Sequence, residues 1–184
     1  MLTQLETNLD ILIPAVEIFR RNSNDEKKLA ILNPAPVRPI DKKILSMFDI
    51  LTPNEVEASI LSGIDVTDFI SAEKAADFFI RLNVNTVIIT MGEQGCFIKS
   101  SGSKGGEKPF TASIPAFKVD TIDTTGAGDA FSGGLAAALA AGSTITDAAL
   151  FGSATAALSV TKIGTAPAMP VLSEIEFFLK KQKL

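Results

Sequence analysis

The chain of 184 residues contains no histidine, tryptophan or tyrosine, and it contains one cysteine. Without histidine, a Ser–His–Asp triad, a histidine general base and most zinc sites are excluded, so acid–base chemistry falls to Asp, Glu, Lys or Cys96. A lone cysteine forms no internal disulfide, which fits a reducing compartment. Cys96 is either a nucleophile or a core strand residue, and its apolar neighbours in GCFIK favour the core.

Charge and hydrophobicity exclude other classes. The net charge is −4 and 46% of residues are hydrophobic, which indicates a soluble globular protein and argues against a nucleic-acid partner. The N-terminus MLTQLETNLD has no basic region, so we expect no signal peptide. The small-residue run GLAAALAAG is too short to span a bilayer, so we expect no membrane association. We expect one domain, located in the cytoplasm and, in a eukaryote, also in the nucleus.

Strand and helix patterns alternate along the chain. Residues 8–21 place apolar side chains at helical spacing (Leu9, Leu12, Ile13, Val16 and Phe19). Strands are expected at 29–32, 49–51, 86–90, 110–114 and 117–122, with a turn at 22–28 and a flexible loop at 100–109. Further helices are expected at 41–48, 52–63, from Ser71, at 127–141, from Thr146 to near Gly164, and from Ser173. This order predicts an α/β fold with a largely parallel sheet.

Helix starts are predicted from capping patterns. In TPNEVEASILSG, Thr52 is expected at the N-cap, Pro53 at the first helical position and Glu55 in a capping box. Gly63 is expected to end that helix. Ser71, Thr146 and Ser173 are expected to cap the later helices.

Four polar loops follow strand candidates. They are NPAP (33–36), TPNE (52–55), TMGEQG (90–95) and DTTGAGD (123–129). In parallel sheets ligands bind at the carboxyl ends of the strands, so these loops are expected to form one site.

DTTGAGD has the chemistry of an anion site. Gly126 and Gly128 permit backbone angles that turn successive N–H groups into one concavity, and the following helix adds its positive end. Asp129 would face the same space and could take a proton from an attacking hydroxyl. The alternative is that Asp129 only complements the helix dipole. Neither a G-x-x-x-x-G-K-[ST] loop nor a G-x-G-x-x-G loop occurs, so a P-loop or Rossmann site has no support.

Two of the other three loops carry weaker signals. In TMGEQG, Thr90 offers a hydroxyl and Gly92 and Gly95 permit close backbone approach, but an ordinary turn explains them equally well. Asn54 and Glu57 lie three apart on one helix face. They could bind phosphate and a hydrated magnesium ion, or form a solvated helix face.

Together the loops resemble a known family. The strings QLE, LNPAP, TPNEVEASILSG, VIITMGEQGC, DTTGAGDAFSGG and AALSVTKIGT resemble ribokinase and the wider PfkB-type carbohydrate kinases, in the family's order. DTTGAGD is the most specific of them. The resemblance implies a ribokinase-like three-layer α/β sandwich with a mostly parallel central sheet, in a single domain spanning 1–184.

The resemblance implies an ATP-dependent sugar kinase that transfers the γ-phosphate to the 5-hydroxyl of D-ribose. Asp129 would be the general base, and Glu6 would also touch the sugar. The anion hole would consist of Gly126, Ala127 and Gly128. Magnesium would be held through water by Asn54 and Glu57. Contacts to ATP are implied for Asn54, Thr90, Met91, Gly92, Glu93, Gln94, Gly95, Gly128, Asp129 and Ser153.

The resemblance also implies an activating monovalent cation, expected to be potassium. Its ligands would come from Asp123, Thr125, Ser159, Lys162, Gly164 and Ala168. Two residues depart from the family. Ala168 lacks the hydroxyl that some members supply, and Ser153 replaces a larger polar residue beside the adenine.

The family's first half has no counterpart in this chain, which begins at the QLE strand. That half supplies early strands of the sheet, a glycine pair that grips the sugar, and a β lid that forms the homodimer. We therefore expect a sheet that is incomplete on its N-terminal side and lacks the lid. Two alternatives stay open: a non-catalytic ATP-binding fragment, and a kinase for fructose or a nucleoside.

Overall fold

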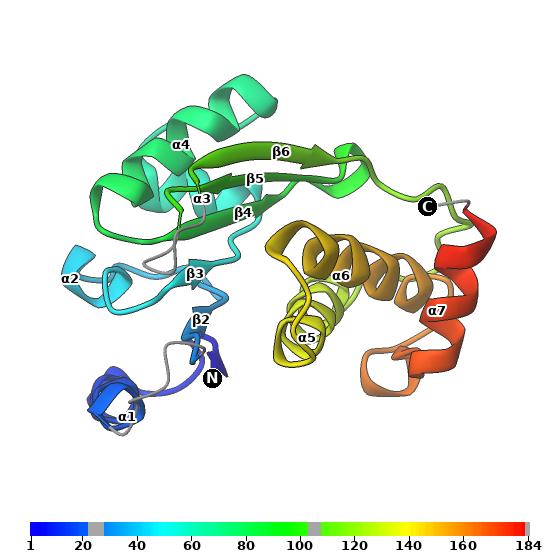
Figure 1. Ribbon diagram of the computed structural model, residues 1–184, viewed down its shortest axis with the longest axis horizontal. Coiled ribbons are helices and arrows are strands. Elements are labelled where there is room, and N and C mark those ends of the chain that lie inside the picture. The colour runs from blue at the N-terminus through cyan, green and yellow to red at the C-terminus, as the bar shows by residue number, and fades with distance from the viewer. Residues whose placement is uncertain (22–27, 103–107, 183–184) are drawn as a thin grey trace. The chain divides into compact units, whose positions relative to one another are not determined.

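The computed structural model describes residues 1–21, 28–102 and 108–182. These residues form two compact units (Figure 1). The first comprises Met1–Met91 and Phe97–Ser113, and the second Gly92–Cys96 and Ile114–Leu184. Most of the turn expected at 22–28 and the centre of the loop expected at 100–109 lie outside the described residues. The expectation of a single domain stays a prediction.

In the described part of the chain, a six-stranded sheet with its strands in chain order forms the frame of the first unit, and only its residues Cys96 and Ile114 belong to the second. The strands are β1 (Leu2–Thr3), β2 (Ile31–Leu32), β3 (Ile50–Leu51), β4 (Thr86–Thr90), β5 (Cys96–Ser100) and β6 (Phe110–Ile114). Strands β1 to β4 pair in parallel. Thr86 at the start of β4 hydrogen bonds Ser100 at the end of β5, Oγ1 to Oγ at 3.0 Å, so these two strands are antiparallel. The predicted α/β class with a mostly parallel sheet is confirmed.

The strand expected at 117–122 was wrong, because these residues form no ladder in the structure. Pro115 follows β6 and has no N–H to donate. At the other end of the segment, the Ile122 and Asp123 N–H groups both donate to Val160 O, at 2.7 and 3.1 Å. DTTGAGD therefore follows an irregular connection and not a strand.

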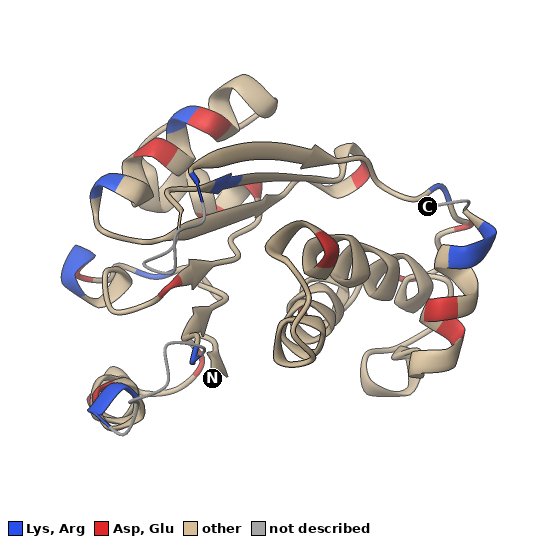
Figure 2. Ribbon diagram, in the orientation of Figure 1, with Lys and Arg blue, Asp and Glu red and all other residues tan. Residues whose placement is uncertain are grey.

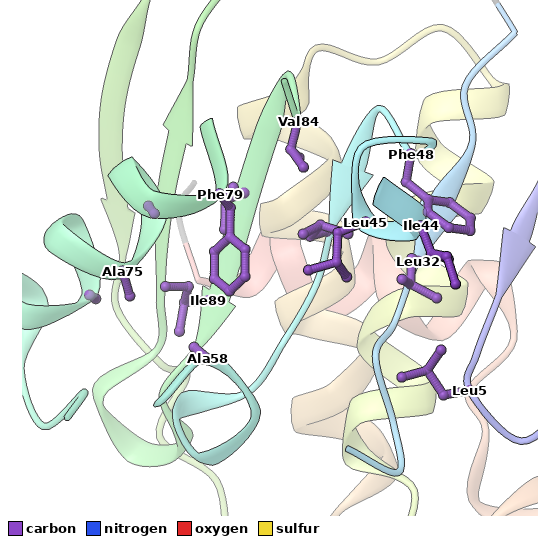
Figure 3. Packing of buried hydrophobic residues seen from close by; sticks show 14 of the residues in the cluster. Leu5, Leu32, Ile44, Leu45, Phe48, Ala58, Ala75, Phe79, Val84 and Ile89 are labelled. Carbon is purple, nitrogen blue, oxygen red and sulfur yellow. The ribbon is translucent and has the colours of Figure 1, made fainter. Parts of the chain in front are cut away.

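Four helices pack against the sheet in the first unit: α1 (Leu9–Arg21), α2 (Lys42–Leu45), α3 (Glu55–Ser62) and α4 (Phe69–Arg81). The predicted apolar face of α1 is confirmed, since Leu12 and Val16 are buried in the core. Figure 3 shows side chains of this core, among them Leu32 and Phe79. Burying each large apolar side chain fully stabilises the fold by roughly 1.5–3 kcal/mol relative to leaving it exposed. The core between these helices and the sheet therefore stabilises the strands of the first unit.

Two caps in this unit differ from the prediction. The N-cap of α3 is Asn54 and not Thr52, and its box partner is Glu57 and not Glu55. Thr52 is still part of the sheet edge, since its N–H donates to Leu32 O at 2.9 Å. Gly63 ends α3 in the left-handed conformation, as predicted.

The second corrected cap is that of α4. Asp68, and not Ser71, is the N-cap, so the helix begins at Phe69. The Ser71 N–H donates to Asp68 Oδ1 at 2.7 Å, and the Asp68 N–H donates to Ser71 Oγ at 3.0 Å. Ser71 therefore completes a reciprocal capping box from inside the helix.

The second unit is helical. It contains the 3-10 turn η1 (Gly92–Gln94), α5 (Ala127–Ala140), α6 (Ile145–Ser159), the 3-10 turn η2 (Ala166–Ala168) and α7 (Leu172–Lys181). The predicted cap Thr146 was wrong: Thr144 is the N-cap, and its Oγ1 accepts from the Asp147 N–H at 3.2 Å. Helix α6 ends at Ser159, well before Gly164. Helix α7 begins one residue before the expected cap Ser173, where the Val171 N–H donates to Glu174 Oε2 at 2.8 Å.

Helices α5 and α6 pack closely because glycines lie where they meet. A Cβ on Gly134 would approach Thr155 Oγ1 to 2.5 Å, and one on Gly152 would approach Phe131 O to 2.7 Å. Both helices are almost uncharged along their length (Figure 2). Nevertheless, among the described residues no helix is both long and apolar enough to cross a membrane.

Candidate active site

In the first unit, the loops at the carboxyl ends of β1, β2 and β3 lie side by side. The Leu5 N–H donates to Ala35 O at 2.8 Å, which joins QLE to NPAP. The Thr90 N–H donates to Pro53 O at 3.0 Å, which joins TPNE to the end of β4. Within this unit QLE thus contacts NPAP, and TPNE contacts the end of β4; that the four polar loops form one site stays a prediction. Glu6 lies exposed in the bend after β1.

Asn54 and Glu57 cap each other. The Glu57 N–H donates to Asn54 Oδ1 at 2.8 Å, and the Asn54 N–H donates to Glu57 Oε2 at 2.9 Å. Glu57 is only 7% exposed, so the alternative of a solvated helix face was wrong. Burial raises the pKa of the Glu57 carboxyl, although the bond from Asn54 opposes the shift. The caps use Oδ1 and Oε2, so Asn54 Nδ2 and Glu57 Oε1 remain for contact with a ligand.

The TMGEQG segment is a glycine-dependent turn. Met91 is buried among the apolar side chains of the first unit, whereas Glu93 and Gln94 in the next turn are exposed. Gly95 has φ 97°, and a Cβ there would lie 2.6 Å from Ala116 N and closer still to Ile114 O. Backbone crowding therefore demands glycine at this position.

In the second unit, Asp123 fixes the DTTGAGD loop. Its Oδ1 accepts from the Thr125 N–H and its Oδ2 from the Gly164 N–H, both at 2.9 Å. Hydrogen bonds from the Thr125 side chain and from the Gly164 and Thr125 amides lower the pKa of the Asp123 carboxyl to about 2. The anionic Asp123 carboxylate therefore links the DTTGAGD loop to the turn after α6 by accepting a hydrogen bond from each.

The predicted anion hole lies at the start of α5. Gly126 is the N-cap in the left-handed conformation, with φ 77° and no side-chain cap. The Ala127 N–H donates to Thr124 O at 3.2 Å, and the Ala130 N–H begins the helix by donating to Gly126 O at 2.9 Å. Asp129 is exposed in the first turn and is the only charged residue of α5. A helix start with a glycine cap and a nearby carboxylate can hold an anion and move a proton beside it.

Four further predicted cation residues lie after or near the end of α6. Gly164 contacts Asp123 directly, and Lys162 donates its N–H to Ser159 O at 3.2 Å. Ala168 is fully buried in η2, and its N–H donates to Thr165 O at 3.0 Å. Asp123, Thr125 and Gly164 are thus brought together, and Ser159 and Lys162 are joined to each other. In the described part of the chain, no three His, Cys, Asp or Glu side chains gather as a metal site.

Comparison with known proteins places this geometry in a family. Residues 4–172 match the pfkB family of carbohydrate kinases. The chain belongs to the pfkB family. It is 41% identical to ribokinase from Haemophilus influenzae over 180 residues, which cover 98% of this chain and 55% of that protein. The chain thus spans about half the length of the curated relatives it matches.

Among the solved structures that are similar to this pfkB-family chain is Arabidopsis thaliana ribokinase complexed with ribose and ATP, with a TM-score of 0.82 and 31% identity, covering 97% of this chain and 55% of that one. Another is an E. coli protein assigned as ribokinase II in complex with ATP and Mg²⁺. It has a TM-score of 0.72 and 26% identity, covering 92% of this chain and 53% of that one.

Cys96 is a core residue of this pfkB-family chain, as the sequence predicted. It is buried, and burial raises the pKa of its thiol to about 11. Its Sγ lies 4.0 Å from Ser153 Oγ, which places the half-buried Ser153 of α6 beside the start of β5.

Sequence reasoning missed Arg38. Its Nη2 donates to Thr7 O at 2.7 Å, across the loops that follow β1 and β2. The available signal was an arginine two residues after NPAP, in a loop already expected at the site.

Proposed function

We propose that this chain contributes the phosphoryl-transfer machinery of a ribokinase-type sugar kinase, which moves the γ-phosphate of ATP to the 5-hydroxyl of D-ribose. The observation that carries the proposal is the start of α5. There, Gly126 caps the helix without a side chain, and the carboxylate of Asp129 stands exposed in the first turn. The match to the pfkB family and the ribose- and ATP-bound relative support this assignment.

Asp129 is the proposed general base. A kinase must remove the proton of the attacking hydroxyl and stabilise the charge on the transferring phosphoryl group. Gly126, Ala127 and Gly128 would bind that charge through backbone N–H groups and the helix dipole, with the Ala127 N–H exchanging its bond to Thr124 O for one to the phosphoryl oxygen. The hydrogen bonds from Thr125 and Gly164 to Asp123 support this role, because they hold the loop before the helix in place.

The proposed ATP contacts include Asn54, Thr90 and Met91, of which Met91 would act through its backbone because its side chain is buried. The other proposed ATP contacts are Gly92, Glu93, Gln94, Gly95, Gly128, Asp129 and Ser153. The turn Gly92–Gln94 with its exposed polar side chains supports this assignment.

Asn54 and Glu57 would hold hydrated MgATP: Glu57 Oε1 would accept from waters on the Mg²⁺ ion, and Asn54 Nδ2 would donate to a phosphate oxygen. A residue pair fits Mg²⁺ because this ion keeps several waters and takes few protein ligands. Glu57→Gln tests the role, since the glutamine Oε1 can still accept from the Asn54 N–H while the charge is lost. We expect calorimetry to show weaker binding of MgATP and unchanged binding of ATP without metal. Equal affinities of wild type and variant for MgATP would reject the role.

For the monovalent cation we assign Asp123, Thr125, Ser159, Lys162, Gly164 and Ala168, largely through backbone oxygens. The bonds that join Asp123 to Thr125 and to Gly164 support a common site for part of this set. Activation by K⁺ but not by Li⁺ would be the expected signature.

Ribose-dependent ADP formation by the purified chain tests the reaction. Asp129→Asn should reduce it by about 10²–10⁴-fold, the usual contribution of a general base. Asp147→Asn is the matched control, since Asp147 is the first-turn acid of α6. Turnover that survives Asp129→Asn would exclude the proposed base.

The second candidate function is a non-catalytic ATP-binding chain. It is favoured by the length, about half that of the ribokinase relatives. Calorimetric binding of ATP without ribose-dependent turnover would support it over the kinase. ADP formation with fructose or a nucleoside in place of ribose would instead change the acceptor and leave the role of Asp129 intact.

A further inference from the structure

Arg38 joins two loops at the carboxyl edge of the sheet in the first unit. Its Nη2 donates to Thr7 O at 2.7 Å, over a separation of 31 residues. The same bend is held at its other end, where the Leu5 N–H donates to Ala35 O at 2.8 Å. The loop after β2 is therefore hydrogen bonded to both ends of the bend 5–7, and Glu6 lies between the two bonded residues.

The position of the Arg38 guanidinium is energetically unfavourable in one respect. Arg38 Nε is buried and has no hydrogen-bond partner within the described residues. A buried donor without an acceptor is unfavourable, so a simpler side chain would suit this position better if packing were its only task. The bond that remains, from a charged donor to a carbonyl, is stronger than a neutral one and fixes the carbonyl it contacts.

We infer that Arg38 is a positioning residue that holds the bend 5–7 so that Glu6 meets the acceptor sugar. This rests on the proposed function, in which Glu6 contacts the sugar. Thr7 directly follows Glu6 in the chain. A hydrogen bond that fixes the Thr7 carbonyl therefore restricts the backbone from which the Glu6 side chain projects. Loss of the contact should weaken acceptor binding, because ordering the bend must then come from the binding energy.

Direct titration with D-ribose and, separately, with ATP tests the role. Arg38→Met removes the donors and the charge and keeps a similar length. It should bind D-ribose about tenfold more weakly, as expected for loss of one charged hydrogen bond, and bind ATP like the wild type. Arg38→Lys retains a charged donor and should restore part of the affinity. Arg21→Met, at the exposed end of α1, makes the same chemical change and should alter neither.

A double-mutant cycle separates positioning from general stabilisation. If Arg38 acts through Glu6, then Arg38→Met should cost little further ribose affinity in a Glu6→Gln background. Additive losses, unchanged ribose affinity in Arg38→Met, or equal weakening of ribose and ATP would each overturn the inference. Failure of the wild type to bind ribose would overturn the acceptor assignment in the proposed function, and the inference with it.

Discussion

Replacing Gly134 by alanine tests whether close packing of α5 on α6 holds the helix that carries Asp129. Two opposing effects set the outcome. In a helix interior, alanine is more favourable than glycine by about 1 kcal/mol. Against this, the new Cβ would lie 2.5 Å from Thr155 Oγ1, 2.9 Å from Thr155 Cβ and 3.1 Å from Gly152 Cα.

Those distances decide whether Gly134→Ala stabilises or destabilises the fold. The contacts to Thr155 and Gly152 involve a rigid β-branched side chain and a backbone atom, so the helices must separate. Overpacking of this kind costs about 1–3 kcal/mol. After the gain in helix propensity, we expect Gly134→Ala to be destabilising by up to about 2 kcal/mol.

Gly133→Ala is the internal control. Gly133 lies one residue earlier in α5, is exposed, and its Cβ would meet nothing within 4 Å. Only the propensity gain remains, so this variant should be stabilised by about 0.5–1 kcal/mol.

Urea unfolding measures both variants. Far-ultraviolet circular dichroism is the readout, because the chain has no tryptophan or tyrosine for intrinsic fluorescence. A shift in midpoint at constant slope reports stability alone. Gly134→Ala as stable as Gly133→Ala would refute the packing argument. Thr155→Ala, which removes the Oγ1 atom, should recover part of the loss in a Gly134→Ala background.

Three further predictions follow from local geometry. Gly95→Ala should lower the melting temperature clearly, since its Cβ would overlap the backbone around Ile114 and its φ of 97° disfavours alanine. Cys96 should react slowly with a thiol reagent at mildly alkaline pH until urea unfolds the chain, because its pKa is raised to about 11. The Asp123 carboxylate, with its pKa lowered to about 2, should stabilise the fold above its unfolded pKa and lose that contribution as pH falls towards 2. Asp123→Ala should therefore flatten the acid limb of the stability profile, and an unchanged limb would contradict the assigned bonds.

Hydrophobic periodicity correctly predicted the helices and strands that bury a continuous apolar face of their own. Helix α1 follows its apolar spacing, and β4 follows its β-branched run, because both bury a continuous apolar face in the first unit. The segment 117–122 has a comparable pattern but forms no strand. Its last amide bonds Val160, a residue 38 positions further on, and such a long-range partner leaves no periodic signal.

Residue types predicted the loops of the site better than the long-range hydrogen bonds that hold these loops in place. Glycine and aspartate at 123–129 mark an anion loop by their own chemistry. The structure places Gly126 in the left-handed conformation, whereas Gly128 lies in α5 without a positive φ, so the special backbone angle predicted there was wrong. The tie from Asp123 to Gly164 spans 41 residues. Arg38 likewise acts on a bend 31 residues away. These supports depend on chain topology, which composition and spacing do not encode.

The segment TPNEVE shows how tertiary context selects between two equivalent local signals. Thr52 with Glu55 and Asn54 with Glu57 have the same capping spacing. The sheet decides between them, because the Thr52 N–H donates to Leu32 O and Pro53 O accepts from the Thr90 N–H. These bonds extend the sheet edge through Pro53, so α3 starts later.

The consequence reaches the proposed magnesium site. Because the cap uses one polar atom of Asn54 and one of Glu57, the two side chains are fixed before any ligand arrives. A ligand at Asn54 Nδ2 or Glu57 Oε1 would therefore meet a preorganised pair and lose little side-chain entropy on ordering them. The same coupling means that a substitution which breaks the cap changes α3 as well as the site. Only a variant that keeps the bond donated by the Asn54 N–H to the side chain at position 57, as Glu57→Gln does, can report on the ion alone.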